Sequence, residues 1–361
     1  MYTFEEVFVD DTRNGTKLKS DEYCLEGRHV IIDQGQNNIA GYTNWEEGLY
    51  IDVPAIIFGD HTRVVKYVDR PFFLGADGVK VLKCKLEGAN YKYLYYMLKN
   101  VRLPDTGYNR HFKWLKEIEF SYPQKNTQDA VVIILDKVQG IINLREQEIK
   151  ELDNLIKSRF VELFGNMTLN PNRWEIISLG KVCDVRDGTH DSPKYYAMGY
   201  PLVTSKNVTS GKIDFSECSL ICEEDYKKIN ERSKVDIGDI LMPMIGTVGK
   251  PVIVDVNREF AIKNVALIKF YEDSKVTNIF VKALLQSDYF DLAVINKIRG
   301  GTQKFIALGD IRKLEICLPP MEVQEKFATY VNHIDKLKSE VQKSLDEMQL
   351  LMDSLMQKYF G

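Results

Sequence analysis

Small polar and basic side chains gather at glycine-marked turns in the second half of the sequence. They are Thr189, His190, Ser205, Lys206, Asn207, Thr247, Lys250, Arg299, Gly301, Thr302, Gln303 and Lys304. Such side chains can reach phosphates and base edges, and glycines let a backbone approach a duplex closely. These residues predict contacts to nucleic acid. An ordinary solvated turn is the alternative for any one of them.

A similar set lies in the first half, at places that correspond to those in the second. It comprises Arg13, Thr16, Lys17, Arg63, Lys66, Arg110, His111 and Lys113. Because the two sets recur at corresponding places, together they favour DNA binding more strongly than any single member does.

Signatures of catalysis are missing from the sequence. It contains no G-x-G-x-x-G after a strand, no G-x-x-x-x-G-K-[ST] loop, no G-x-S-x-G elbow and no H-E-x-x-H pair. The five histidines share no metal-ligand spacing, and Cys218 and Cys222 have no second Cys or His pair nearby. We therefore predict no catalytic residue, no metal site and no cofactor bound by this chain. A nuclease with an unrecognised site is the alternative.

The composition is that of a globular protein without a bulk positive charge. The chain has 361 residues, enough for roughly two to three domains of about 150 residues. Lys and Arg number 48 and Asp and Glu 52, which gives a net charge of −4. Any positive surface for DNA must therefore be local or shared with a partner.

The expected compartment is the cytoplasm. No apolar run approaches the roughly 18 to 20 residues that cross a bilayer, and the first residues lack the pattern of a signal peptide. The six cysteines are scattered, as is typical of free thiols in a reducing compartment. We expect no association with a membrane.

The sequence repeats itself. Residues 123–165 align without a gap with residues 319–361 at an offset of 196, which places Gln128 on Gln324. Residues 11–17 (DTRNGTK) resemble residues 184–190 (DVRDGTH). The repeat predicts two copies of one plan, each a mixed domain followed by a segment of about 40 residues.

The two 40-residue segments carry a helical pattern. The first seam consists of Val131, Leu135, Val138, Ile142, Ile149, Leu152, Ile156 and Leu163. The second consists of Phe327, Val331, Ile334, Val341, Leu345, Met348, Met352 and Leu355. Alternating steps of four and three predict long helices with a coiled-coil seam, each a rod of roughly 57 Å at about 1.5 Å per residue.

Two such helices most simply pack on each other and hold the mixed domains at a fixed distance. The alternative is that each helix folds back on its own domain. Ile134, Ile141 and Leu155 widen the apolar stripe, so we expect each helix to pack on more than one neighbour.

The mixed domains read as strands with a few helices, which predicts an α+β fold. In the second copy, residues 200–203 and 260–271 have strand patterns, and residues 223–231 and 278–296 have helical patterns. The expected boundaries are a first mixed domain over 1–122, a helix over 123–165, a second mixed domain over 166–318 and a helix over 319–361.

The motifs, in this order, resemble one known family. They are residues 187–195 (DGTHDSPKY), 200–203 (YPLV), 206–208 (KNV), 211–215 (GKIDF), 238–241 (GDIL), 246–249 (GTVG), 318–325 (LPPMEVQE) and 359–361 (YFG). Doubled around two long helices, they make the chain similar over nearly its whole length to the specificity (S) subunit of type I restriction-modification systems.

The resemblance implies a non-catalytic DNA-specificity subunit. Two target-recognition domains would each read one half of a split sequence on double-stranded DNA, and the helices would pack antiparallel as the spacer. Two modification (methyltransferase) subunits would dock on the helices and carry S-adenosylmethionine. Two restriction subunits can join such complexes and use ATP and Mg²⁺. A coiled-coil adaptor without a DNA role is the alternative.

The two copies differ in ways that bear on the target. Residues 174–180 (WEIISLG) open the second domain and have no match in the first. Residues 79–83 match residues 265–269 at an offset of 186, so the first copy is about ten residues shorter between this strand and its helix. We therefore expect an asymmetric target, and weak DNA binding by the chain outside its complex.

Overall fold

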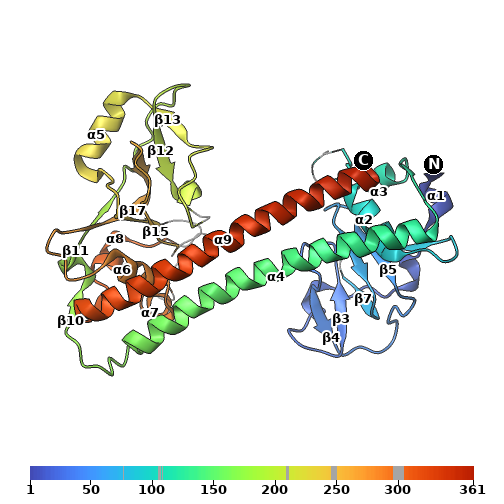
Figure 1. The fold of residues 1–361 in the computed structure, drawn as a ribbon, viewed down its shortest axis with the longest axis horizontal. Coiled ribbons are helices and arrows are strands. Elements are labelled where there is room, and N and C mark those ends of the chain that lie inside the picture. Colours follow the sequence, from blue (N-terminus) through green and yellow to red (C-terminus); the bar gives the residue numbers. More distant parts are fainter. Residues whose placement is uncertain (76, 105–106, 108, 209–210, 245–249, 296–304) are drawn as a thin grey trace. The chain divides into compact units, whose positions relative to one another are not determined.

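The protein is described from a computed structural model, which covers residues 1–75, 77–104, 107, 109–208, 211–244, 250–295 and 305–361. These residues are mixed helix and strand, as predicted (Figure 1). They form two compact units. Unit 1 is Met1–Glu146 with Lys343–Gly361, and unit 2 is Gln147–Gln342. The division falls within both long helices, so each unit contains parts of both.

Two larger sheets form the body of unit 1. The four-stranded sheet has the order β2 (Phe8–Asp10), β8 (Val79–Cys84), β5 (Ala55–Gly59), β6 (Val65–Val68). The three-stranded sheet has the order β4 (Gly41–Thr43), β3 (His29–Ile32), β7 (Phe72–Leu74). Strands β3 and β7 are parallel, and the other pairs in these sheets are antiparallel. β5 is buried along its whole length, as expected of a central strand with an apolar sequence.

Unit 2 repeats this plan strand for strand. Its four-stranded sheet has the order β11 (Cys183–Asp187), β17 (Val265–Phe270), β14 (Ile240–Pro243), β15 (Val252–Ile253). Its three-stranded sheet has the order β13 (Ser219–Ile221), β12 (Tyr200–Thr204), β16 (Ala261–Lys263), with β12 and β16 parallel. The repeat found in the sequence is thus a repeat of topology.

Shorter elements complete each unit. Unit 1 adds the pair β1 (Tyr2–Thr3) and β9 (Glu119–Phe120), with α1 (Phe4–Val7), η1 (Thr12–Asn14), η2 (Ser20–Glu22), α2 (Tyr91–Asn100) and α3 (Phe112–Leu115). Unit 2 adds the pair β10 (Ile176–Ser178) and β18 (Glu315–Cys317), with η3 (Leu179–Lys181), η4 (Ser205–Val208), α5 (Glu223–Ser233), α6 (Asn278–Leu285), α7 (Asp288–Ala293) and α8 (Leu308–Arg312).

Both predicted long helices are present. They are α4 (Lys125–Phe164) and α9 (Met321–Phe360). Every seam position predicted on them is buried or half-buried. Within unit 2, Phe160 and Phe164 of α4 share a core with Phe327 of α9, and Lys338 forms an ion pair of 2.5 Å with Asp153.

Within unit 1 the opposite ends of these helices meet. Val131 and Leu135 from the start of α4 share a core with Met356 near the end of α9. The first part of α4 therefore meets the last part of α9 in unit 1, and the reverse holds in unit 2. This pairing confirms the antiparallel packing.

One prediction about the helices concerns a neighbour outside this chain. The widened stripe of Ile134, Ile141 and Leu155 predicts a further packing neighbour, and all three side chains are exposed, so this neighbour stays a prediction. They lie away from the seam, where the described residues place no second element over them.

Two predicted elements are each divided. The strand expected over residues 260–271 is β16 and β17, separated by Asn264, whose φ of 54° is left-handed. Asparagine tolerates this conformation better than most residues, and the turn sends the chain from the small sheet into the large one. The helix expected over residues 278–296 is α6 and α7, which break at Gln286 and Ser287.

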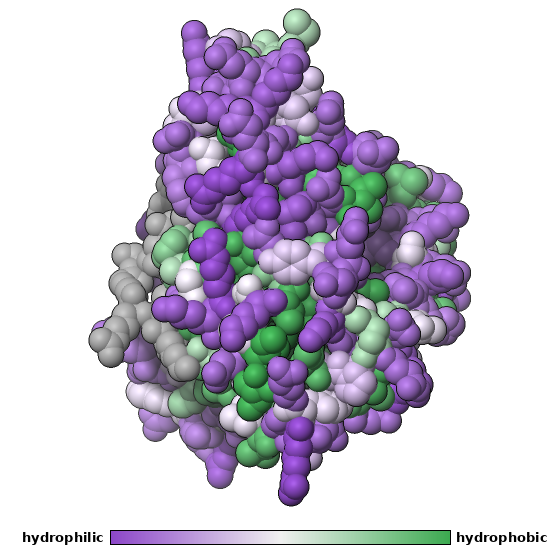
Figure 2. Space-filling model, turned by 90° about the vertical axis from the view of Figure 1, so that its left-hand side faces the viewer, coloured by the Kyte–Doolittle hydropathy of each residue, from purple (hydrophilic) through white to green (hydrophobic). Residues whose placement is uncertain are grey.

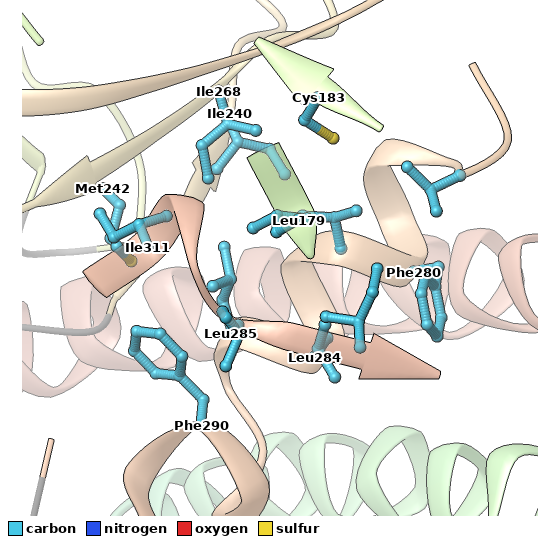
Figure 3. Close-up of a cluster of buried hydrophobic side chains, with 14 of the residues drawn as sticks. Leu179, Cys183, Ile240, Met242, Ile268, Phe280, Leu284, Leu285, Phe290 and Ile311 are labelled. Carbon is cyan, nitrogen blue, oxygen red and sulfur yellow. The ribbon is translucent and has the colours of Figure 1, made fainter. Parts of the chain in front are cut away.

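The core of unit 2 lies between its four-stranded sheet and the helices packed on it. Figure 3 shows Ile240 and Ile268 of the sheet in one cluster with Phe280 and Leu284 of α6, and Met242 beside Ile311 of α8. Burial of such a contiguous apolar cluster fixes where the ends of β11, β14 and β17 emerge, and these ends carry the candidate site.

Candidate nucleic-acid interface

A buried glutamine anchors each long helix to the body of its unit. Gln128 and Gln324 are almost fully buried, and the Nε2 of each donates to a proline carbonyl just before its helix at 2.9 Å. The Oε1 of Gln128 accepts the N–H of Asn90 at 3.1 Å, and that of Gln324 accepts the N–H of Thr277 at 2.9 Å. Asn90 and Thr277 cap α2 and α6, so one set of bonds joins equivalent helices in both units.

A lysine ion pair also repeats. Lys83 on β8 contacts Asp52 at 2.8 Å, and Lys269 on the equivalent strand β17 contacts Asp236 at 2.9 Å and Asp239 at 2.5 Å. In both units the partner acids precede the central strand, β5 or β14. These contacts hold the backbone in the same arrangement in both units. The exposed residues around this shared frame can then differ between the units.

In unit 2 the loop after β11 carries a network of charged groups. Asp187 ends β11 and is buried, and its Oδ2 lies 2.8 Å from Nε2 of His190. Arg232, near the end of α5, donates from Nη2 to the Oδ1 of Asp187. Nδ1 of His190 lies 2.8 Å from Oδ1 of Asn264, in the turn between β16 and β17. The network thus joins a loop, a helix and a turn that lie far apart in the sequence.

The surroundings of His190 favour its charged form. The hydrogen bonds to Asn264 and to Asp187 raise the pKa of His190 above its usual 6.5. His190 is nevertheless exposed, so this charge faces solvent. An exposed imidazolium beside an exposed guanidinium can bind a phosphate.

Two predicted contact residues of unit 2 instead stabilise a turn. Asn207 is buried, and its Oδ1 accepts the backbone N–H of Thr204 at 2.9 Å. The hydroxyl of Ser205 donates to the carbonyl of Asn264 at 3.1 Å. Both side chains hold η4 against the sheet, which speaks against direct base contacts by either of them. Lys206 and Lys250 are exposed, and Thr189 is half-buried beside β16.

Part of the predicted set lies outside the described residues. It comprises Thr247, Arg299, Gly301, Thr302, Gln303 and Lys304. For these residues the DNA-contact role stays a prediction.

In unit 1, two of the predicted residues, Arg63 and Lys66, line a pocket of about 660 Å³. Its charged lining residues are Arg63, Lys66, Lys99 and Arg102, and no carboxylate lines it within the part of the chain that the structure describes. Gln36, Asn38 and Tyr95 add polar groups, and Phe58 and Leu98 contribute apolar surface. A pocket of this composition attracts an anion that also has an apolar part.

Two predicted contact residues of unit 1 prove to be buried. The side chain of Lys66 is only 3% exposed, and its Nζ donates to the Asn37 carbonyl at 2.6 Å and lies 3.4 Å from Asp33. Burial lowers the pKa of Lys66. His111 is also buried, and its Nδ1 lies 3.1 Å from the Asp60 carbonyl. Both side chains are buried and bound to groups of their own unit, which speaks against direct DNA contacts by either of them.

The remaining predicted residues of unit 1 are more accessible. Arg13, Lys17, Arg110 and Lys113 are exposed, and Lys17 forms an ion pair of 3.2 Å with Asp77. The backbone carbonyl of Thr16 accepts the N–H of Leu74 at the end of β7, as that of Thr189 accepts the N–H of Asn264 after β16. The sequence echo between residues 11–17 and 184–190 therefore marks equivalent places in the two units.

The structure adds residues that the sequence did not single out. Arg232 and Asn264 join His190 in unit 2, and Lys99 and Arg102 join Arg63 in unit 1. Each of these residues lies in a different element from the predicted residue that it joins. Residue spacing along the sequence therefore could not predict that they belong to the site. The doubled topology was the one available signal, because it predicts that strand ends and helix ends meet at one surface.

The surface of unit 2 in Figure 2 is mostly hydrophilic, above all in the upper part, where α5, β12 and β13 lie in Figure 1. Among the described residues, no group of three or more metal-binding side chains is found. No helix in this described part is long and apolar enough to span a membrane.

Comparison with known proteins places this architecture. Residues 1–154 and 171–347 match the family model described as type I restriction modification DNA specificity domain. The MjaVIII specificity subunit of a type I restriction enzyme from Methanocaldococcus jannaschii is 26% identical over 295 residues, which cover 73% of this chain and 69% of that protein. The MjaIX specificity subunit from the same organism is 23% identical, over 75% of this chain and 68% of its own length.

Solved structures agree in fold. The S subunit of a type I restriction-modification system from M. genitalium superposes with a TM-score of 0.58 at 17% identity, covering 99% of this chain and 95% of the other. A chain from a study of assembly and conformational transition of the type I R-M system gives a TM-score of 0.52 at 17% identity. The doubled sheets and the family match lead to one conclusion: the chain belongs to the specificity subunits of type I restriction-modification systems, as its motifs predicted, and is not an adaptor without a DNA role.

Proposed function

We propose that each unit reads one half of a bipartite, asymmetric DNA sequence. The observation that carries this proposal is the doubling itself. Both units have the same strand order and the same buried glutamine and lysine contacts, while their exposed loops carry different residues. One frame with two different surfaces suits two different half-sites, because base edges are read by the side chains that reach the groove.

In unit 2 the contacts would come from the loop around His190, from Lys206 and Lys250, and from the predicted residues of 296–304. In unit 1 they would come from Arg63, Lys99 and Arg102 around the pocket, together with Arg110 and Lys113. Basic groups of this kind position a protein on phosphates, and polar side chains among them read bases.

The long helices would serve the protein partners. Exposed apolar side chains on α4 and α9 are Ile133, Ile134, Ile141, Leu144, Leu155, Val161, Met321, Leu337, Leu350 and Leu351. Such a concentration on two helices favours a protein interface. Its occupants in our proposal are two modification subunits that carry S-adenosylmethionine, and through them restriction subunits that use ATP and Mg²⁺.

The partners also resolve the problem of charge. With a net charge of −4, the chain cannot bind DNA by bulk attraction. A complex in which modification subunits complete the clamp needs only local positive surfaces on this chain. We therefore expect the isolated chain to bind DNA weakly and the assembled complex to bind it tightly, with a steep dependence on salt.

Methylation mapping tests the proposal. The gene is expressed with its modification subunit in a host without such a system, and methylated bases are located by sequencing. We expect one bipartite, non-palindromic motif that disappears when this gene is omitted. Unchanged methylation without the gene, or a motif with identical half-sites, would refute the proposal.

A further inference from the structure

We propose that Asp187 is a positioning residue that holds His190 and Arg232 side by side, as a pair of cations that contacts one DNA phosphate. This inference rests on the proposed DNA-reading function of unit 2. It assigns a role to a buried carboxylate, and to an arginine that lies outside the motifs of the family resemblance.

A positioning role requires that Asp187 is buried and that the two cations it holds are exposed. The side chain of Asp187 is 7% exposed, whereas those of His190 and Arg232 are 61% and 69% exposed. Asp187 lies at the end of β11, opposite Ala266 of β17, so the sheet fixes its backbone. Its two carboxylate oxygens bind one cation each. The carboxylate therefore lies on the buried side of the network, and the two cations lie on its solvent-exposed side.

The second ring nitrogen of His190 also has a fixed neighbour. Nδ1 lies 2.8 Å from Oδ1 of Asn264, whose backbone is held in the left-handed region. An oxygen acceptor on each nitrogen favours the imidazolium, since both nitrogens then donate. Arg232 is tied from a further side, because its carbonyl accepts Nη1 of Arg186 at 2.9 Å.

The charges around the network leave an excess of positive charge at its surface. Asp187 neutralises one of the two cations that it binds. Asp184 on β11 is paired with Arg186 at 2.5 Å, and Lys263 on β16 donates to the Ser192 hydroxyl at 2.6 Å. Asp191 and Lys194 follow His190 in the loop, and Lys206 lies on η4. A phosphodiester carries one negative charge, which matches the excess at the network.

A phosphate fits this site better than a base edge does. Arg232 already uses part of its fork on Asp187, so it lacks the free bidentate geometry with which arginine reads guanine. Contacts to phosphate fix register and supply affinity at every sequence. The pair should therefore affect how tightly the complex binds, and leave the recognised motif unchanged.

The experiment measures DNA affinity against pH for the complex with its modification subunits. Fluorescence anisotropy of a duplex that contains the methylated motif is recorded from about pH 6 to 8.5. The wild-type complex should lose affinity as His190 deprotonates. Asp187→Asn should weaken binding at pH 6 on the order of fivefold, the scale of one partly exposed charge contact. It should also move the pH midpoint of binding downwards.

Two further variants separate positioning from folding. His190→Gln should flatten the pH profile around neutral pH. Asp184→Asn, which removes a neighbouring carboxylate but no direct contact of Asp187, should keep the wild-type midpoint. If Asp187→Asn lowers affinity but leaves the midpoint where it was, or if it changes neither, the positioning role is refuted. If the wild-type complex fails to bind the motif at any pH, the proposed function itself fails.

Discussion

The two units share a frame and differ at their surfaces. Gln128 and Gln324 make matching bonds to the cap residues of α2 and α6, and Lys83 and Lys269 pair with acids at matching places. All these contacts lie where a helix or a loop joins a sheet. The shared features therefore concern how each unit is held together.

The differences lie in what each unit adds between equivalent strands. In unit 2, α5 lies between β13 and β14 and supplies Arg232, whereas in unit 1 residues 44–54 join β4 to β5 without a helix. Unit 2 builds its basic surface around the buried carboxylate of Asp187. Unit 1 lines a pocket with Arg63, Lys99 and Arg102. Two ways to display cations on one frame are what an asymmetric target requires.

The largest expected effect concerns a shared aromatic contact. Phe164, at the end of α4, lies 4.9 Å from Phe280 on α6, and Phe360, at the end of α9, lies 5.2 Å from Tyr93 on α2, both measured between ring centres. Phe164 is buried, whereas Phe360 is half-buried. Phe164→Ala should lower the free energy of unfolding by about 3–5 kcal/mol, and Phe360→Ala by roughly half as much.

Hydrogen exchange followed by mass spectrometry checks this prediction, since it assigns the loss of protection to peptides of one unit. Phe164→Leu, which keeps much of the apolar volume, is the control. Equal losses in the two alanine variants would mean that the two helix ends are held equally tightly, and would contradict the difference in burial.

The buried glutamines should behave alike. Leucine in place of Gln128 or Gln324 leaves a proline carbonyl and a cap N–H without their partner. Each variant should lose about 1–3 kcal/mol of unfolding free energy, the cost of an unsatisfied buried polar group. Denaturant titration with each variant measures the effect, and Gln→Glu serves as a comparison of similar shape. A cost in only one unit would break the claim of a shared frame.

A smaller effect is expected at the basic pocket of unit 1. Lys99→Ala and Arg102→Ala should each weaken DNA binding by the assembled complex severalfold. Each should also lower the slope of log affinity against log salt by about 1 for every phosphate that the variant no longer neutralises. Anisotropy titrations at several salt concentrations measure the slope. Arg70→Ala, an exposed cation that faces Asp69 in the same unit, is the matched control. Equal slopes for all three variants would remove the pocket from the interface.

The doubled arrangement of domains and helices could be predicted from the sequence, but only some of the residues of the candidate DNA interface could. Two features of the sequence predicted the long helices: the repeat of residues 123–165 in residues 319–361, and the apolar seam with steps of four and three. Both could be read from the sequence because helical periodicity is a local property. The burial of Lys66 and His111 could not be predicted from the sequence, because burial depends on distant neighbours, Asn37 and Asp60. Arg232 was missed for the same reason, since only the fold brings α5 to the end of β11.

The smallest expected effect is a difference between the two units in how their stability depends on pH. The pKa of folded His190 lies above its usual 6.5, so its contribution to stability is fully present below about pH 6.5 and is lost as the pH rises through the folded pKa. Lys17 takes the place of His190 in the aligned motif of unit 1, so unit 1 has no histidine at this position. The gap in melting temperature between wild type and His190→Gln should therefore narrow from pH 6 to pH 8.5, while the gap for Lys17→Gln stays constant. Parallel pH profiles for both variants would show that Asp187 and Asn264 hold His190 as firmly when it is neutral, and the two units would then differ in geometry but not in their response to protons.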